Sequence, residues 1–392
     1  MKHLVNDQVK KLEIPGIRKI SNMLVDYPDA INLTLGQPDF ITPEHIKASA
    51  KNAIDRNRTS YTHNAGLLEL RQAASEYFHY KYGLTYDSDA EILITNGASE
   101  ALDITFRTIL EKGSEVLLPV PIYPGYEPLI SLCGAIPVYI DTSFNDFKLN
   151  AELIEKHITN RTKCIVLPYP SNPIGTVLLE EELSGIAELL KDKEIFIVSD
   201  EIYSEHTYSG RHFSIAAYPS MRDKTIVING LSKSHAMTGW RIGFTFAPKY
   251  LTEEMLKVHL YNSVCACTIS QYAALEALTK GQDDALIMKR EYQKRRDYVF
   301  NRLISMGLDV LKPEGAFYLF PSILEYRMNS YEFSKRLLEE AGVAVVPGSA
   351  FTKAGEGYIR ISYAYSLEHL ETGLDRLEKF IKNIKEVRVS NV

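Results

Sequence analysis

Short apolar runs recur along the middle of the chain, and turn residues and then a stretch with helical spacing follow each of them. These runs are rich in Val, Ile and Leu, and they do not alternate with polar residues. Continuous apolar runs are typical of strands that are covered on both faces, as in a largely parallel sheet with crossover helices. We predict strands over residues 91–95, 115–119, 137–140, 163–168, 195–200, 225–229 and 241–247.

Stretches with helical spacing separate these runs. The overall pattern changes near residue 285. In residues 180–191, apolar side chains at 183, 186, 187 and 190 fall on one face, which predicts an amphipathic helix. Such alternation of strands and helices predicts an α/β layered domain. Beyond residue 285 we expect a long helix over 285–306, ended by Gly307, then strands over 315–320 and 358–363 that flank a helix over 331–341.

The patterns divide the chain into three parts. We expect an N-terminal arm over residues 1–30 that packs with the small domain, a large α/β domain over 31–285 and a smaller α+β domain over 286–392. The length of 392 residues is ample for a large buried core.

Composition and charge exclude several classes of protein. The chain is 45% hydrophobic and 24% charged, as soluble globular proteins are, and its formal net charge is −6. A mildly acidic chain without a basic block lacks the electrostatic footprint of a nucleic-acid-binding protein. No apolar run approaches the ~20 residues of a membrane helix, and the polar N-terminus lacks a secretory signal. The 4 cysteines form neither a disulfide framework nor a zinc spacing. We therefore expect a cytoplasmic enzyme with no nucleic-acid partner, no membrane contact and no metal.

The most informative chemistry lies between residues 230 and 243. Lys233 follows the end of a predicted strand inside a turn rich in Gly and Ser. Burial at such an edge lowers the pKa of a lysine and leaves a nucleophilic amine. Ser232 and Arg241 beside it could hold a phosphate through a hydroxyl and a guanidinium fork. Taken alone, a surface turn with ordinary ion pairs is the alternative.

The whole segment, Gly-Leu-Ser-Lys-Ser-His-Ala-Met-Thr-Gly-Trp-Arg-Ile-Gly, resembles the pyridoxal-phosphate attachment signature of the class I/II aminotransferases. The resemblance extends from the region of Ile31 to the C-terminus. It implies fold type I of the transferases that depend on pyridoxal 5'-phosphate (PLP), with a three-layer α/β/α large domain around a mostly parallel sheet and a smaller α+β domain. It also implies that PLP is the cofactor, attached by Lys233, which then acts as catalytic base and acid on the α-proton of the substrate.

Further motifs match the family in order and imply roles around the cofactor ring. In Val-Ser-Asp-Glu-Ile-Tyr, Asp200 would pair with the pyridine nitrogen and Tyr203 with the phenolate oxygen. Asn172, in an Asn-Pro-x-Gly turn, would bond the same oxygen, and Tyr123 would stack on the ring. Without the resemblance, Asp200 reads equally well as a helix N-cap and Tyr123 as a packed loop residue.

The cofactor phosphate would lie where a predicted strand meets a helix. Free backbone N–H groups and the helix dipole favour an anion at such a junction. The resemblance assigns the phosphate to Gly97, Ala98, Ser99, Ser232, Arg241 and Tyr61. Tyr61 would reach the phosphate of the neighbouring subunit, which implies a homodimer with shared active sites. The Gly-x-Gly-x-x-Gly fingerprint is absent, which counts against a nicotinamide enzyme.

The substrate carboxylate has its own predicted residues. Arg360 corresponds to the family arginine that binds the α-carboxylate, for which a planar fork is suited, and Asn172 lies beside it. The backbone at Gly36 would approach the same group, since no side chain intervenes. Without the resemblance, Arg360 is interpreted as a charged residue on an edge strand.

The resemblance implies an aminotransferase that moves an amino group between an L-amino acid and a 2-oxo acid by a ping-pong mechanism. Residues 14–18 and 60–66 are similar to the Bacillus-type N-acetyl-L,L-diaminopimelate aminotransferases of lysine biosynthesis, which work with 2-oxoglutarate. Aspartate and aromatic aminotransferases share nearly all of the motifs and remain alternatives. A PLP-dependent carbon–sulfur lyase on the same scaffold is a further one.

Overall fold

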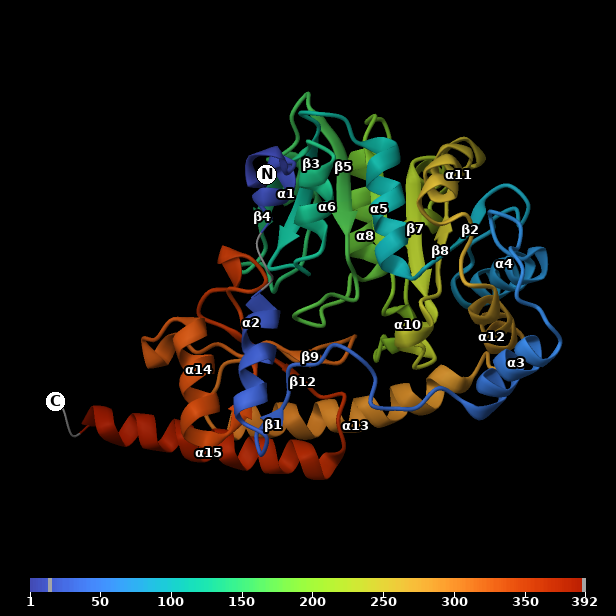
Figure 1. The fold of residues 1–392 in the computed structure, drawn as a ribbon. Helices are drawn as coiled ribbons and strands as arrows, with labels where there is room; N and C mark the ends of the chain where they lie inside the picture. Colours follow the sequence, from blue (N-terminus) through green and yellow to red (C-terminus); the bar gives the residue numbers. More distant parts are fainter. Residues whose placement is uncertain (13–15, 390–392) are drawn as a thin grey trace.

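The computed structural model describes residues 1–12 and 16–389 and has a larger and a smaller α/β unit (Figure 1). The larger unit is built on a 7-stranded sheet in the order β2-β8-β7-β6-β5-β3-β4, in which only β8 runs antiparallel to its neighbours. Its strands are β2 (Ile92–Thr95), β3 (Glu115–Val120), β4 (Ile136–Asp141), β5 (Thr162–Leu167), β6 (Phe196–Asp200), β7 (Thr225–Gly230) and β8 (Gly243–Phe246). Every strand predicted from an apolar run in this part of the chain is confirmed.

Helices cover both faces of this sheet, so the larger unit has three layers. Val116 and Leu117 are neighbours on β3, yet they belong to clusters on opposite faces because side chains alternate along a strand. One face is covered by α5 (Ala98–Ile109), α6 (Tyr126–Leu132) and α11 (Lys249–Ser263). The other is covered by α3 (Glu44–Asp55), α4 (Leu68–Tyr82), α7 (Ala151–Glu155), α8 (Glu180–Leu190) and α12 (Thr268–Thr279). Two short helices, α9 (Pro219–Arg222) and α10 (Leu231–Ser234), flank β7.

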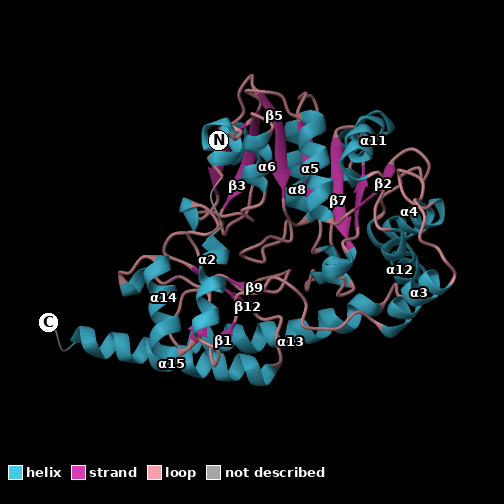
Figure 2. Cartoon of the chain, viewed as in Figure 1, coloured by secondary structure: helices cyan, strands magenta, loops and turns pink. Residues whose placement is uncertain are grey.

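The smaller unit joins short strands to long helices (Figure 2). Its 3-stranded antiparallel sheet has the order β11 (Val346–Pro347), β12 (Ile359–Ser362), β9 (Tyr318–Leu319). The helices are α13 (Asp284–Ser305), α14 (Ser330–Ala341) and α15 (Leu367–Val389). The predicted helices over 285–306 and 331–341 are confirmed. The strand expected over 315–320 is shorter, because the φ of Ala316 is 55°, which interrupts an extended chain.

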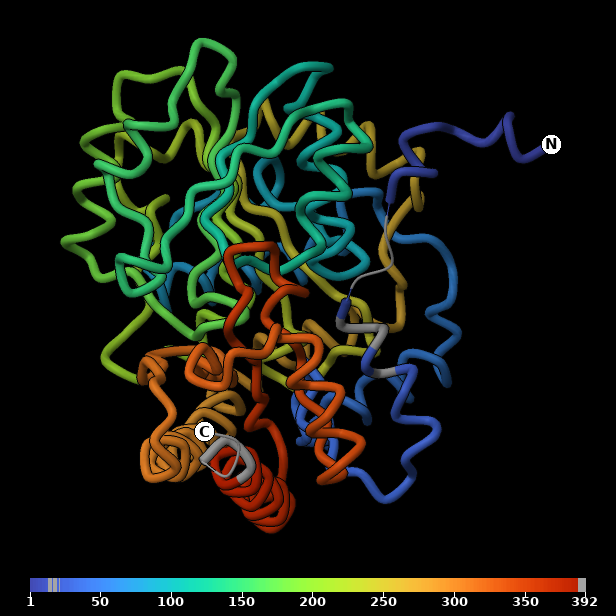
Figure 3. The backbone as a smooth tube through the Cα atoms, turned by 90° about the vertical axis from the view of Figure 1, so that its left-hand side faces the viewer, coloured from blue at the N-terminus to red at the C-terminus, as the bar shows by residue number. Residues whose placement is uncertain are grey.

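The N-terminal segment contacts both units as it runs along their side (Figure 3). Helix α1 (Asp7–Lys10) lies against α6 of the larger unit. In α2 (Gly16–Met23), Ile20 packs with Leu338 and Ala344 of the smaller unit. Strand β1 (Ile31–Asn32) then pairs with β10 (Val343–Ala344), so residues that we assigned to the large domain lie beside the smaller one.

The domain limits at 30/31 and 285/286 stay a prediction. Residues 14 and 15 of the 14–18 motif lie outside the described residues. Within the described ranges, no helix is both long and apolar enough to cross a membrane.

Candidate active site

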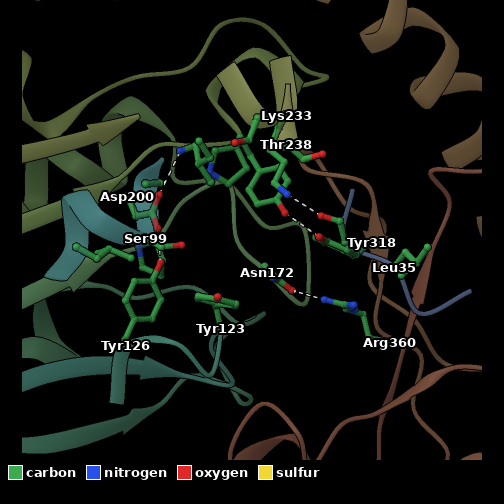
Figure 4. A pocket seen from close by; sticks show the side chains of 18 of the residues that line it. Leu35, Ser99, Tyr123, Tyr126, Asn172, Asp200, Lys233, Thr238, Tyr318 and Arg360 are labelled. Atoms are coloured by element: carbon green, nitrogen blue, oxygen red, sulfur yellow. Dashed lines mark hydrogen bonds between the residues drawn. The ribbon is translucent and has the colours of Figure 1, made fainter. Parts of the chain in front are cut away.

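A cavity of ≈ 350 Å³ lies between the two units, beside the ends of β6 and β7 (Figure 4). Ligands of open α/β sheets bind at the carboxyl ends of the strands, which is where these residues lie. The cavity is lined by most of the residues that the sequence singled out: Gly36, Ala98, Ser99, Tyr123, Asn172, Asp200, Tyr203, Ser232, Lys233, Arg241 and Arg360. Gly97 and Tyr61 are not among the lining residues.

Lys233 lies on α10, directly after β7. The turn expected here is a short helix, and it carries the amine into the cavity. Its Nζ donates a hydrogen bond to the carbonyl oxygen of Gly36 at 2.6 Å. Burial, together with the nearby Arg360 and Arg241, lowers the pKa of Lys233 to about 8. Near neutral pH a larger fraction of Lys233 than of an ordinary lysine is therefore neutral and nucleophilic.

Asp200 ends β6 and is buried. The phenolic hydroxyl of Tyr126 donates to Oδ2 at 2.6 Å, and the backbone N–H of Ile202 donates to Oδ1 at 3.3 Å. The N-cap reading is wrong, because the next element is a short 3₁₀-helix (Ser204–His206) and no α-helix starts at Asp200. Burial raises the pKa of Asp200, so a protonated ring nitrogen brought into the cavity would stabilise its ionised form.

Two tyrosines in this site were not predicted. Tyr126 belongs to the same motif as Tyr123, but only the fold turns its hydroxyl toward Asp200. Tyr318 comes from β9 in the smaller unit, and its hydroxyl lies 2.7 Å from that of Tyr203 (Figure 4). A Cβ at Gly36 would come within 2.7 Å of the Tyr318 hydroxyl, which is a further reason for glycine at this position.

Arg360 lies on β12, the central strand of the small sheet, so the edge-strand reading is wrong. Its Nη1 donates to Oδ1 of Asn172 at 2.8 Å and its Nη2 to the carbonyl of Thr34 at 2.6 Å. The guanidinium lies over the Tyr318 ring, 4.3 Å from the centroid. Its Nε is buried and has no hydrogen-bond partner in the described structure. A buried, unsatisfied cationic donor favours an anionic ligand such as a carboxylate.

The junction between β2 and α5 forms a cradle for an anion. Gly97 has a φ of 81° and packs beneath Arg241, since a Cβ here would lie 2.3 Å from Arg241 Nη2. The first N–H groups of α5, at Ala98 and Ser99, have no partner within the helix. Arg241 itself adopts a left-handed conformation and donates to the carbonyl of Asn96 at 3.3 Å. Helix dipole, free N–H groups and guanidinium together suit a phosphate.

Tyr61 lies away from this cavity. Its side chain is 81% exposed, and it lines a separate surface hollow with residues 265–269. One chain therefore does not bring Tyr61 to its own cradle, and the role assigned to it stays a prediction.

The cavity residues fit PLP and an amino acid in their chemistry: a nucleophilic amine, a buried carboxylate, a cradle that suits a phosphate and a guanidinium whose Nε has no hydrogen-bond partner in the described structure. Among the described residues, no group of three or more His, Cys, Asp or Glu side chains is placed to hold a metal ion.

Comparison with known proteins gives the same picture over almost the full chain. Residues 28–377 match the family of class I and II aminotransferases. The chain is 61% identical over 386 residues to a probable N-acetyl-LL-diaminopimelate aminotransferase of Bacillus subtilis, with 98% of each chain covered. It is 42% identical to an aspartate aminotransferase of Pyrococcus abyssi, over 97% of this chain and 99% of that one. The crystal structure of an aromatic aminotransferase from Pyrococcus horikoshii superposes with a TM-score of 0.89 at 43% identity, over 93% of this chain and 99% of that chain. The chain thus belongs to the class I and II aminotransferases, and it is a PLP-dependent enzyme that exchanges amino groups between amino acids and 2-oxo acids.

Proposed function

We propose that this aminotransferase moves an amino group between N-acetyl-L,L-diaminopimelate and 2-oxoglutarate, as a step of lysine biosynthesis. The observation that carries the proposal is the identity of 61% over 98% of both chains to the relative named for that substrate. The aspartate and aromatic relatives stand at 42% and 43% identity.

Each cavity residue has a task in this reaction. When bound, PLP supplies an electron sink for charge that develops at the α-carbon of the amino acid. Lys233 attaches the cofactor and then carries the α-proton, for which a pKa of about 8 suits it as a base and as an acid. Asp200, which accepts a hydrogen bond from Tyr126, would pair with the ring nitrogen of the bound cofactor.

Arg360 and Asn172 orient the substrate. Their mutual hydrogen bond of 2.8 Å places a guanidinium and an amide side by side, and the free Nε of Arg360 adds a donor for the α-carboxylate. A carboxylate fixed there would orient the α-carbon of the substrate relative to Lys233, so that binding energy is used for orientation.

The working unit that we propose is a homodimer with shared sites. Tyr61, 81% exposed, lies on the loop between α3 and α4, and Tyr261, 89% exposed, lies on the last turn of α11. Hydrogen bonds from Thr268 to the Ser60 carbonyl and from Asn64 to the Val264 carbonyl join that loop to the chain that follows α11. Large exposed aromatic side chains gathered on one face favour a protein partner. A second copy covering this face would bring Tyr61 toward the cradle of its neighbour.

A panel of amino donors tests the substrate. The holoenzyme is assayed with 2-oxoglutarate and, in turn, N-acetyl-L,L-diaminopimelate, L-aspartate, L-phenylalanine and unacetylated L,L-diaminopimelate, with glutamate formation as the readout. We expect kcat/KM for the acetylated donor to exceed the others by about tenfold or more, the discrimination that one or two side-chain contacts supply.

A higher kcat/KM for aspartate or phenylalanine would replace the proposal with one of the sibling activities. The lyase alternative has its own readout. With L-cystathionine as the amino donor and no 2-oxo acid, a lyase releases ammonia and pyruvate continuously. An aminotransferase given an amino acid alone instead stops after one equivalent, with the amine stored on the cofactor.

A further inference from the structure

A largely buried carboxylate lies next to the phosphate cradle and does not line the cavity. Glu100 is on the first turn of α5, and its Oε2 accepts hydrogen bonds from the backbone N–H of Asn96 at 2.5 Å and from the Asn96 side-chain amide at 3.0 Å. Asn96 is the residue that leads from β2 into Gly97. Glu100 therefore holds both the backbone N–H and the side-chain amide of Asn96 at the entrance to the cradle.

The other oxygen of Glu100 is held by α11. Its Oε1 accepts hydrogen bonds from His259 Nδ1 at 3.0 Å and from the hydroxyl of Ser263. His259 is fully buried, and the Glu100 side chain is 12% exposed. Burial alone would raise the pKa of Glu100, but the hydrogen bonds from His259, Ser263 and Asn96 lower it to about 2. These hydrogen bonds therefore favour the carboxylate form of Glu100.

The arrangement leaves the cradle free for a phosphate. The carboxylate of Glu100 accepts hydrogen bonds from Asn96 and His259, and Glu100 is not among the residues that line the cavity. The guanidinium of Arg241 contacts the carbonyl of the same Asn96 from the cavity side. The backbone of Asn96 is thus held through both of its polar groups, the N–H by the carboxylate of Glu100 and the carbonyl oxygen by the guanidinium of Arg241.

We propose that Glu100 is a positioning residue for the cofactor phosphate: with His259 and Ser263 it fixes Asn96, and through Asn96 it sets how well the start of α5 binds the phosphate group. The same carboxylate joins the cradle to the end of α11. In the chain that follows α11, the N–H of Cys267 donates a hydrogen bond to Asn96 Oδ1 at 3.4 Å. The next residue, Thr268, donates a hydrogen bond to the carbonyl of Ser60, in the loop that carries Tyr61. The inference concerns the cofactor and holds whichever amino acid is the substrate.

The experiment compares PLP with pyridoxal, which has the same ring and aldehyde and no phosphate. Apoenzyme variants Glu100→Ala and Glu100→Gln are titrated with each compound, and the absorbance of the lysine-bound form gives the two dissociation constants. We expect the affinity for PLP to fall about tenfold or more in Glu100→Ala, as for a lost charged hydrogen bond. The affinity for PLP falls less in Glu100→Gln, because the glutamine side chain keeps one carbonyl oxygen as a hydrogen-bond acceptor. The affinity for pyridoxal stays within about twofold.

Asp103 provides the matched control. It is a carboxylate on the same helix, and it also contacts α11, through Asn262 at 3.3 Å, and it pairs with Arg107. It makes no contact with Asn96, so Asp103→Asn is expected to leave both affinities unchanged. Ser263→Ala removes one donor and keeps the carboxylate, and it is expected to give a smaller loss specific to PLP. This variant keeps the test open if Glu100→Ala does not fold.

Two outcomes would overturn the proposal. Equal losses for PLP and pyridoxal in the Glu100 variants would show a general structural role with no link to the phosphate. Unchanged PLP affinity in Glu100→Gln and Ser263→Ala, or a loss in Asp103→Asn as large as theirs, would show that the contact with Asn96 has no bearing on the cradle.

Discussion

At the scale of the residue, the properties of this site come from ordinary side chains that are buried where water cannot solvate their charges or complete their hydrogen bonds. Lys233 is surrounded by the cations Arg360 and Arg241 and is largely desolvated, and both effects disfavour its ammonium form. Arg360 is buried with one N–H unsatisfied, which leaves a donor ready for a carboxylate. The chemistry therefore lies in the surroundings of each side chain as much as in its type.

The lowered pKa of Lys233 predicts how the apoenzyme takes up its cofactor. Only the neutral amine attacks an aldehyde, and a lysine with a lowered pKa is neutral above pH about 8 and protonated below it. We expect the rate of PLP attachment, followed by the visible absorbance of the lysine-bound cofactor, to rise with a midpoint near pH 8. Nα-acetyl-lysine under the same conditions controls for the titration of PLP itself, with an amine pKa of about 10.4. Coincident midpoints for the protein and the free amine would contradict the prediction.

At the scale of the element, the junction of β2 with α5 is built by close backbone contact with β8. Gly243, at the start of β8, pairs with Thr95 at the end of β2. A Cβ at Gly243 would lie 2.5 Å from the carbonyl carbon of Gly97 and 2.7 Å from the nitrogen of Ala98. Both atoms are backbone, so neither can move without shifting the cradle.

Substitution Gly243→Ala should therefore weaken cofactor binding and lower stability. We expect about 1–3 kcal/mol of destabilisation, as for overpacking elsewhere in proteins, and a comparable loss of PLP affinity. Equilibrium unfolding in urea and PLP titration of the apoenzyme measure the two effects. Gly239→Ala in the same segment is the control, because nothing lies within 4 Å of the Cβ it adds. If the two variants behave alike, the close contact is not what shapes the cradle.

At the scale of the whole molecule, the active site needs both units and, in our proposal, two chains. Arg360 and Tyr318 come from the smaller unit, whereas Lys233 and Asp200 come from the larger one. Tyr61 points away from the cavity of its own chain. A shared site predicts that two different defects can be repaired by mixing chains.

Mixed dimers of Lys233→Ala and Tyr61→Ala chains test this directly. Lys233→Ala alone should fold and show no transamination, and Tyr61→Ala alone should bind PLP less tightly. In a mixed dimer, one of the two sites would combine an intact Lys233 with the intact Tyr61 of the other chain. At limiting PLP, we expect activity to exceed that of either parent and to approach about half of the wild-type value per mixed dimer. The oligomeric state is checked by light scattering. No gain on mixing would argue that Tyr61 serves its own chain or no site at all.

The sequence by itself determined local features of this protein: which segments form the strands of the large sheet and which motif residues line the cavity. Continuous apolar runs predicted the strands of the large sheet, because a strand that is covered on both faces needs apolar side chains at successive positions. The lysine segment and the other motifs predicted most of the residues that line the cavity. Most of these motifs follow the carboxyl ends of β2, β3, β5, β6 and β7, and these ends meet at one edge of the large sheet.

Only the tertiary structure decided which side chains complete the site. Tyr126, Tyr318 and Glu100 are separated by long stretches of chain from their partners Asp200, Tyr203 and His259. Contacts of this kind depend on how helices and sheets pack, and the spacing of residues along the chain does not encode them. The same holds for the pairing of β1 with β10, since strands of two residues are too short to produce a pattern.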